Sequence, residues 1–185
     1  TSRAILKEMC DADLDALGFF GVTKTNFDGA PGWLSRTGYT GDLGYELWVD
    51  NAYALQLYDA LIANGERHNI EPVGLDALDI SRIEAGFILR GVDYLGANEA
   101  IIDDQKSTPF ELGLGWTVKL ANREPFIGQA ALEGAKKNGS PWALVGLDID
   151  WPSLEALFAQ HGLPPHAPAA AWRSNIPIYF EGRQV

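Results

Sequence analysis

The chain has 185 residues, 46% of them hydrophobic and 21% charged, which is the composition of a globular protein long enough to bury a core. Its 14 basic and 25 acidic residues give a formal net charge of −11, which disfavours nucleic acid or an anionic membrane as a partner, because both attract a positive surface. The single cysteine excludes an internal disulfide framework, and no apolar run reaches the about 18 residues that a membrane span needs, so we expect a cytoplasmic protein.

The first part of the chain alternates between helical and strand patterns, separated by residues that cap or interrupt an element. The absence of a start methionine at Thr1 indicates a chain cut from a longer protein. Helices are expected over residues 3–9 and 14–17, and strands over residues 19–26, 33–40 and 45–50. Apolar residues at three- and four-residue steps predict two further helices, over residues 52–64 and 75–85.

The second part of the chain continues this alternation after an extended stretch. The expected order is a strand over residues 112–120, a helix over 127–136, a strand over 142–149 and a helix over 151–161. The Pro- and Ala-rich stretch that follows is typical of a linker, and residues 176–180 with the turn E-G-R predict a β-hairpin. The uneven connections favour an α+β fold with a mostly antiparallel sheet and packed helices over a doubly wound sheet.

The stretch Ser35–Val49, S-R-T-G-Y-T-G-D-L-G-Y-E-L-W-V, has the pattern of a hairpin tip and its return strand. Its glycines mark a tight turn or a backbone that another group approaches closely. They are spaced three residues apart, at Gly38, Gly41 and Gly44. The alternation in the return strand predicts one face with Tyr45, Leu47 and Val49 and another with Glu46 beside Trp48.

Glu46 is the first candidate for a binding residue. A carboxylate beside an aromatic side chain can accept hydrogen bonds from a ring that bears N–H groups. The alternative is an ordinary solvent-facing strand residue, which is the commoner role of a glutamate in an alternating pattern. Other catalytic templates fail, because the three histidines lack metal-ligand spacing and the sequence has no Gly-rich phosphate loop or Ser nucleophile elbow.

Two blocks of sequence resemble the folate-dependent aminomethyltransferase family, which includes the T-protein of the glycine cleavage system and its demethylase relatives. They are S-R-T-G-Y-T-G-D-L-G-Y-E-L at Ser35–Leu47 and G-L-D-A-L-D-I-S-R-I-E-A-G-F at Gly74–Phe87, with a weaker block, F-I-G-Q-A-A-L, at Phe126–Leu132. The resemblance implies a partial folate-binding α+β region over residues 1–150. Residues 151–185 would then be a linker and the truncated start of a C-terminal β-barrel.

The resemblance also implies roles for individual residues. Glu46 stands where the family binds the pterin of tetrahydrofolate, and Tyr39 stands where a side chain lines the folate cavity. Arg82 is the candidate for recognising a carboxylate, and a helix pair with Asp79, three residues earlier, is the alternative interpretation. A second arginine of the family is replaced here by Leu78, which favours a donor other than the aminomethyl group.

The function implied by the resemblance is that of a fragment of a tetrahydrofolate-dependent aminomethyl- or methyltransferase. The catalytic aspartate of the family would precede Thr1, so no catalytic residue is assigned and the fragment alone is expected to be inactive. The one-carbon donor could be a lipoyl-linked aminomethyl group, with a lipoyl carrier protein as partner, a sulfonium, a methylated amine or an aryl methyl ether. The alternatives are a non-catalytic folate-binding or interaction module and the T-protein-like domain of a fused oxidase or dehydrogenase.

Overall fold

A computed structural model of the chain describes residues 2–140, 142–174 and 176–184. The chain divides into two compact units, of which unit 1 comprises Thr1–Phe87 with Pro168–Trp172, and unit 2 comprises Ile88–Ala167 with Arg173–Val185. Among the described residues every buried side chain belongs to unit 1. The same residues contain no helix that is both long enough and apolar enough to cross a membrane.

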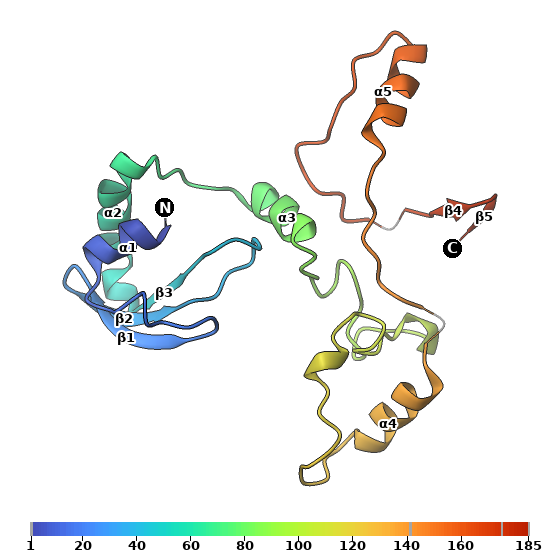
Figure 1. Cartoon of the computed structure of the whole chain (residues 1–185), viewed down its shortest axis with the longest axis horizontal. Coiled ribbons are helices and arrows are strands. Elements are labelled where there is room, and N and C mark those ends of the chain that lie inside the picture. Colours follow the sequence, from blue (N-terminus) through green and yellow to red (C-terminus); the bar gives the residue numbers. More distant parts are fainter. Residues whose placement is uncertain (1, 141, 175, 185) are drawn as a thin grey trace. The chain divides into compact units, whose positions relative to one another are not determined.

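Unit 1 is built on a three-stranded antiparallel sheet in the order β1–β2–β3 (Figure 1). The strands are β1 (Val22–Phe27), β2 (Ala30–Ser35) and β3 (Glu46–Val49). Asp28 and Gly29 join the first two strands, and their φ angles of 50° and 94° match the two-residue Asp-Gly turn of a β-hairpin. Because two residues suffice for this turn, β2 begins earlier than the predicted residue 33.

Helices α1 (Ser2–Met9) and α2 (Ala54–Gly65) pack against each other and share one core with the sheet (Figure 1). The carboxylate of Asp50 accepts a hydrogen bond from the backbone N–H of Ala52 at 2.9 Å. This bond caps the short helix η1 (Asn51–Tyr53), which leads into α2. The buried apolar core consists of Ile5, Leu6, Met9, Leu14, Leu17, Phe27, Ala30, Leu34 and Leu57.

The sheet has one buried face and one exposed face. The return-strand side chains that pack against the core are Tyr45, Leu47 and Val49. The predicted division of the return strand into two faces is therefore confirmed, and the face with Tyr45, Leu47 and Val49 is the inner one. On the outer face Trp33 and Trp48 are cross-strand partners, and they remain 47% and 59% exposed. Glu46, two residues before Trp48, lies on this outer face as the alternation predicts.

The remaining elements are short. Unit 1 also contains η2 (Glu66–His68) and α3 (Leu75–Glu84). The elements described in unit 2 are η3 (Asp103–Gln105), η4 (Gly115–Thr117), α4 (Gln129–Asn138), α5 (Trp151–Gln160), β4 (Tyr179–Phe180) and β5 (Arg183–Gln184). Strands β4 and β5 pair antiparallel, which confirms the predicted hairpin at this position. The α+β class with antiparallel sheets is also confirmed.

The predicted helix over residues 14–17 is wrong. The carboxylate of Asp13 accepts hydrogen bonds from the backbone N–H groups of Asp15 and Ala16, at 3.0 and 3.1 Å, and the chain makes a turn there. So short a segment cannot offset the cost of nucleating a helix. The turn instead places Leu14 in the core, where it is 1% exposed.

The strands predicted over residues 112–120 and 142–149 are also wrong. The first stretch contains the helix η4, and the second has no strand. A strand needs a partner that satisfies its backbone groups. Among the described residues, the second stretch makes one backbone hydrogen bond to another segment, from Leu144 N–H to the carbonyl of Glu111 at 2.8 Å.

The positions of two leucines predict that the same substitution, leucine to alanine, will lower the free energy of unfolding by very different amounts. Leu34 is 0% exposed in the central strand, and Leu55 on α2 is 72% exposed. We expect Leu34→Ala to lower the free energy of unfolding by about 2–5 kcal/mol, because it leaves a cavity in the core. Leu55→Ala should change it by less than about 0.5 kcal/mol. Urea denaturation followed by tryptophan fluorescence measures both, and equal losses would contradict the assignment.

Candidate functional site

The candidate site is built on residues 36–45, the loop that joins β2 to β3. Within this loop Gly41 has a φ of 84°, a conformation that L side chains rarely adopt. A Cβ atom added at Gly41 would lie 2.7 Å from the Cβ of Ala85, which follows α3. The prediction that the glycines mark a tight turn and a close approach is therefore confirmed at Gly41.

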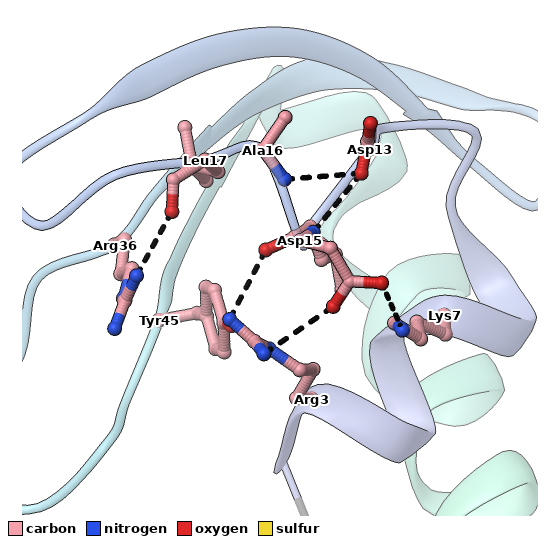
Figure 2. Close-up of polar contacts among 9 residues, drawn as sticks. Arg3, Lys7, Asp13, Asp15, Ala16, Leu17, Arg36 and Tyr45 are labelled. Carbon is pink, nitrogen blue, oxygen red and sulfur yellow. Dashed lines mark hydrogen bonds and ion pairs between the residues drawn. The ribbon is translucent and has the colours of Figure 1, made fainter.

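Polar contacts hold the C-terminal end of this loop to α1 (Figure 2). Arg3 donates a hydrogen bond from Nε to the hydroxyl of Tyr45 at 3.1 Å and forms an ion pair with Asp15 at 3.3 Å. Lys7, one turn further along α1, contacts the other carboxylate oxygen of Asp15 at 2.5 Å. The hydrogen bond from Lys7, together with the charges of Lys7 and Arg3, lowers the pKa of Asp15 below its ordinary value of 3.8.

Arg36 holds the other end of the loop. Its backbone N–H donates to the carbonyl of Gly21 at 2.9 Å, and its carbonyl accepts from Phe20 at 3.1 Å. Its Nη1 donates to the carbonyl of Leu17 at 3.0 Å (Figure 2). Its Nε is buried and has no hydrogen-bond partner among the described residues. The guanidinium is therefore fixed in place while part of its donor capacity remains unused.

Two hydroxyl groups orient the carboxylate of Glu46. Ser35 is its cross-strand partner and donates to Oε2 at 3.4 Å. Thr37 donates to the same oxygen, and the two hydroxyl oxygens lie 2.8 Å apart. The other oxygen, Oε1, accepts no hydrogen bond from the described residues, and Glu46 is exposed. The carboxylate is thus held through one oxygen, and its other oxygen has no hydrogen-bond donor among the described residues.

The loop forms a hollow of about 220 Å³ together with side chains from its flanks. We call it the glycine-loop hollow, and its lining residues are Phe19, Arg36, Thr37, Gly38, Gly41, Asp42, Leu43, Gly44 and Phe87. Thr37 belongs to this lining and also donates to Glu46. The predicted binding carboxylate therefore stands one hydrogen bond away from the hollow.

A larger hollow, of about 430 Å³, lies on the outer face of the sheet. Its lining residues are Lys24, Pro31, Gly32, Trp33, Trp48, Val49 and Asp50. The Nζ of Lys24 lies 5.0 Å from the ring centroid of Trp33. None of the predicted site residues lines this hollow. The glycine-loop hollow is the candidate site despite its smaller volume, because Thr37 connects it to Glu46.

Tyr39 and Arg82 both contact Phe87, which is one wall of the glycine-loop hollow. The ring of Tyr39 stacks on that of Phe87 with 5.7 Å between centroids and 14° between planes. Arg82 is 2% exposed, and it donates to the carbonyl of Phe87 at 3.1 Å and to Asp79 at 2.7 Å. The predicted helix pair of Asp79 and Arg82 is therefore present. In this structure both predicted residues support the wall of the hollow.

Six of the nine lining residues were not among the predicted candidates, and Thr37 and Leu43 are two of them. The other four have charged or aromatic side chains. These are Phe19, Arg36, Asp42 and Phe87. Arg36 and Asp42 lie within the glycine motif, and Phe87 ends the second block of resemblance. Their positions inside the two blocks could therefore have identified these three residues as candidates for the site. Nothing in the sequence, however, shows that Phe19 lies beside them.

Comparison with known proteins matches residues 1–122 of the chain to the family model described as the GCVT N-terminal domain. An aminomethyltransferase of Halothermothrix orenii is 37% identical over 163 residues, which are 88% of this chain and 42% of that protein. An aminomethyltransferase of Streptomyces coelicolor is 40% identical over 149 residues, which are 79% of this chain and 38% of that protein. A trimethylamine-oxide aldolase of Ruegeria pomeroyi is 39% identical over 158 residues, 80% of this chain and 19% of that protein. The chain thus spans less than half of each relative.

The ion pairs at α1 predict how acid weakens the support of the loop. Because the pKa of Asp15 is lowered in the folded chain, its contribution to stability is present above its unfolded pKa and is lost as the pH falls through the folded value. The free energy of unfolding should therefore fall more between pH 7 and pH 3 in the wild type than in Asp15→Asn. Urea denaturation at both pH values measures this, and Lys7→Met should reduce the difference as well. An unchanged pH dependence in both variants would show that these ion pairs contribute nothing.

Proposed function

Because the chain belongs to the glycine cleavage T-protein family, we propose that it is part of a tetrahydrofolate-dependent one-carbon transferase. The observation that supports this most directly is the carboxylate of Glu46, oriented by Ser35 and Thr37 beside the glycine-loop hollow. We also propose that the protein is cytoplasmic and that its partner is a small-molecule one-carbon donor or a lipoyl carrier protein.

Glu46 suits the nitrogen-rich edge of a pterin. Its free Oε1 can accept a hydrogen bond from a ring N–H, and a charged acceptor makes such a bond stronger than a neutral one. Ser35 and Thr37 hold Oε2, so the carboxylate needs little ordering when a ligand binds. Tetrahydrofolate, when bound, supplies the nitrogen that accepts the one-carbon unit. The chain would contribute position and charge to this chemistry.

Tyr39 and Arg82 are proposed to act on the same site through Phe87. A ring that is stacked on one side and held at its backbone carbonyl presents a fixed wall to the hollow. This arrangement favours the positioning of Phe87 as the role of both residues. Arg82 is 2% exposed and paired with Asp79, and this burial favours the positioning role over direct contact with a carboxylate of the ligand.

The organisation of the longer protein is part of the proposal. Residues 1–150 would belong to the folate-binding region, and residues 151–185 to a linker and the start of a C-terminal β-barrel, with the catalytic aspartate outside this chain. The match to the Ruegeria pomeroyi trimethylamine-oxide aldolase, which covers 19% of that protein, agrees with the alternative that this region is one domain of a larger fused enzyme. The matches to the two aminomethyltransferases cover 42% and 38% of those proteins and agree with the first organisation.

Replacing the carboxylate of Glu46 tests the proposal. We expect Glu46→Gln in the full-length protein to weaken tetrahydrofolate binding by about 10- to 100-fold, because a hydrogen bond to a charged group contributes about 1.5–3 kcal/mol. Isothermal titration calorimetry under anaerobic conditions measures the dissociation constant. Glu71→Gln removes an exposed carboxylate elsewhere in unit 1 and should leave it unchanged. An unchanged constant in Glu46→Gln would reject the assignment.

A further inference from the structure

We propose that the larger hollow, on the outer face of the sheet of unit 1, is a docking site for a partner protein. The segment that it binds is extended and rich in proline, and it carries an acidic side chain. We call the hollow around Trp33 and Trp48 the outer-face hollow. It shares no lining residue with the glycine-loop hollow, so this docking surface is separate from the candidate site.

A row of side chains crosses the three strands of the sheet at this hollow. Lys24 on β1 is the cross-strand partner of Trp33 on β2, and Trp33 is the partner of Trp48 on β3. Side chains two residues apart on a strand share a face, so Pro31 lies beside Trp33. All four residues line the hollow, and so does Asp50, which follows β3. Aromatic and aliphatic rings therefore lie next to each other on this surface.

The strand register also separates the outer-face hollow from Glu46. Glu46 pairs with Ser35, which stands two residues after Trp33 on β2. Pro31, which lines the hollow, stands two residues before Trp33. The tryptophan pair therefore lies between this hollow and the carboxylate that is proposed to hold the pterin.

Both tryptophans offer ring surface and a hydrogen-bond donor to a partner. Trp33 is 47% exposed and Trp48 is 59% exposed. Neither indole N–H donates a hydrogen bond to the residues that the structure describes. A polyproline II segment has no internal hydrogen bonds, so its carbonyl groups can accept from such donors, and aromatic-lined grooves are the surfaces that bind it.

An extended proline-rich segment suits this face better than an added strand or a helix. Strand addition uses the unpaired backbone groups of a sheet edge, whereas Trp33 lies in the central strand, which is paired on both sides. An amphipathic helix needs a continuous apolar groove, and here the charged Lys24 and Asp50 interrupt one. A proline-rich segment is already ordered before it binds, so it loses little conformational freedom on a shallow surface.

The charges around the hollow call for an acidic side chain at one end of the segment. The Nζ of Lys24 lies 5.0 Å from the ring centroid of Trp33, and Lys24 forms no ion pair within the described part of the chain. A carboxylate of the partner can therefore pair with this ammonium group on the β1 side. Asp50 has the opposite charge and follows β3, so it disfavours an acid on that side. This arrangement orients the segment with its acidic end toward β1.

Three matched peptides test the proposal with the full-length protein. The first has six prolines followed by a glutamate, the second ends in glutamine instead, and the third has alanines in place of the prolines; all three are acetylated and amidated. We expect calorimetry to show that the first binds about two- to fivefold more tightly than the second, which lacks an exposed ion pair. It should bind at least about tenfold more tightly than the third, which lacks the proline rings.

Substitutions in the hollow should reproduce these differences. Trp33→Ala and Trp48→Ala should each weaken the first peptide by at least about tenfold, because aromatic anchors dominate binding at such surfaces. Lys24→Gln should reduce the affinity of the first peptide to that of the glutamine peptide, whose own binding stays unchanged. Trp116→Ala removes an exposed tryptophan of unit 2 and should leave all three affinities unchanged.

Further measurements separate peptide docking from folding and from folate binding. Thermal melting shows whether the tryptophan variants stay folded, and Lys24→Gln decides alone if they do not. Absent or equal binding of the three peptides, or unchanged binding in a folded Trp33→Ala variant, would overturn the proposal. Displacement of the first peptide by saturating tetrahydrofolate, or a dimer that Trp33→Ala dissociates while no peptide binds, would overturn it as well. Loss of tetrahydrofolate affinity in Glu46→Gln would still support the proposed function in each of these cases.

Discussion

The candidate site depends on the way both ends of one glycine-rich loop are tied to the first 17 residues of the chain. Arg3 holds Tyr45 at the end that enters β3, and Arg36 reaches the carbonyl of Leu17 from the end that leaves β2. A loop of this length without such ties would pay a large entropic cost for any single conformation. With both ends held, the side chains of the loop can face a ligand in a defined arrangement.

Because side chains alternate along a strand, one face of this hairpin packs on the core and the other carries Glu46. Tyr45 and Leu47 pack on the core, so Glu46 between them must point to the opposite face. A one-residue change of register would bury the carboxylate and expose the apolar side chains. The cross-strand pair of Leu34 and Leu47 therefore helps to specify the position of the carboxylate, together with its own hydrogen bonds.

Features that depend on residues close together in the sequence could be predicted, whereas features that depend on contacts between distant segments could not. The shared face of Glu46 and Trp48 and the pair of Asp79 and Arg82 depend on spacing within one element, and both were predicted. The approach of Phe19 and Phe87 to the loop depends on contacts between distant segments, which no local pattern reports. The strand expected at residues 142–149 failed for the opposite reason, since its apolar pattern is real but the described residues offer it no partner strand.

The close approach of Gly41 to Ala85 sets how near the loop of the candidate site lies to the end of α3. A methyl group at Gly41 would collide with that of Ala85, and the φ of 84° disfavours any L side chain there. A residue other than glycine at this position would therefore move the loop away from the end of α3. Related chains that carry a larger residue at position 41 should therefore hold this loop at a different distance from the helix that corresponds to α3.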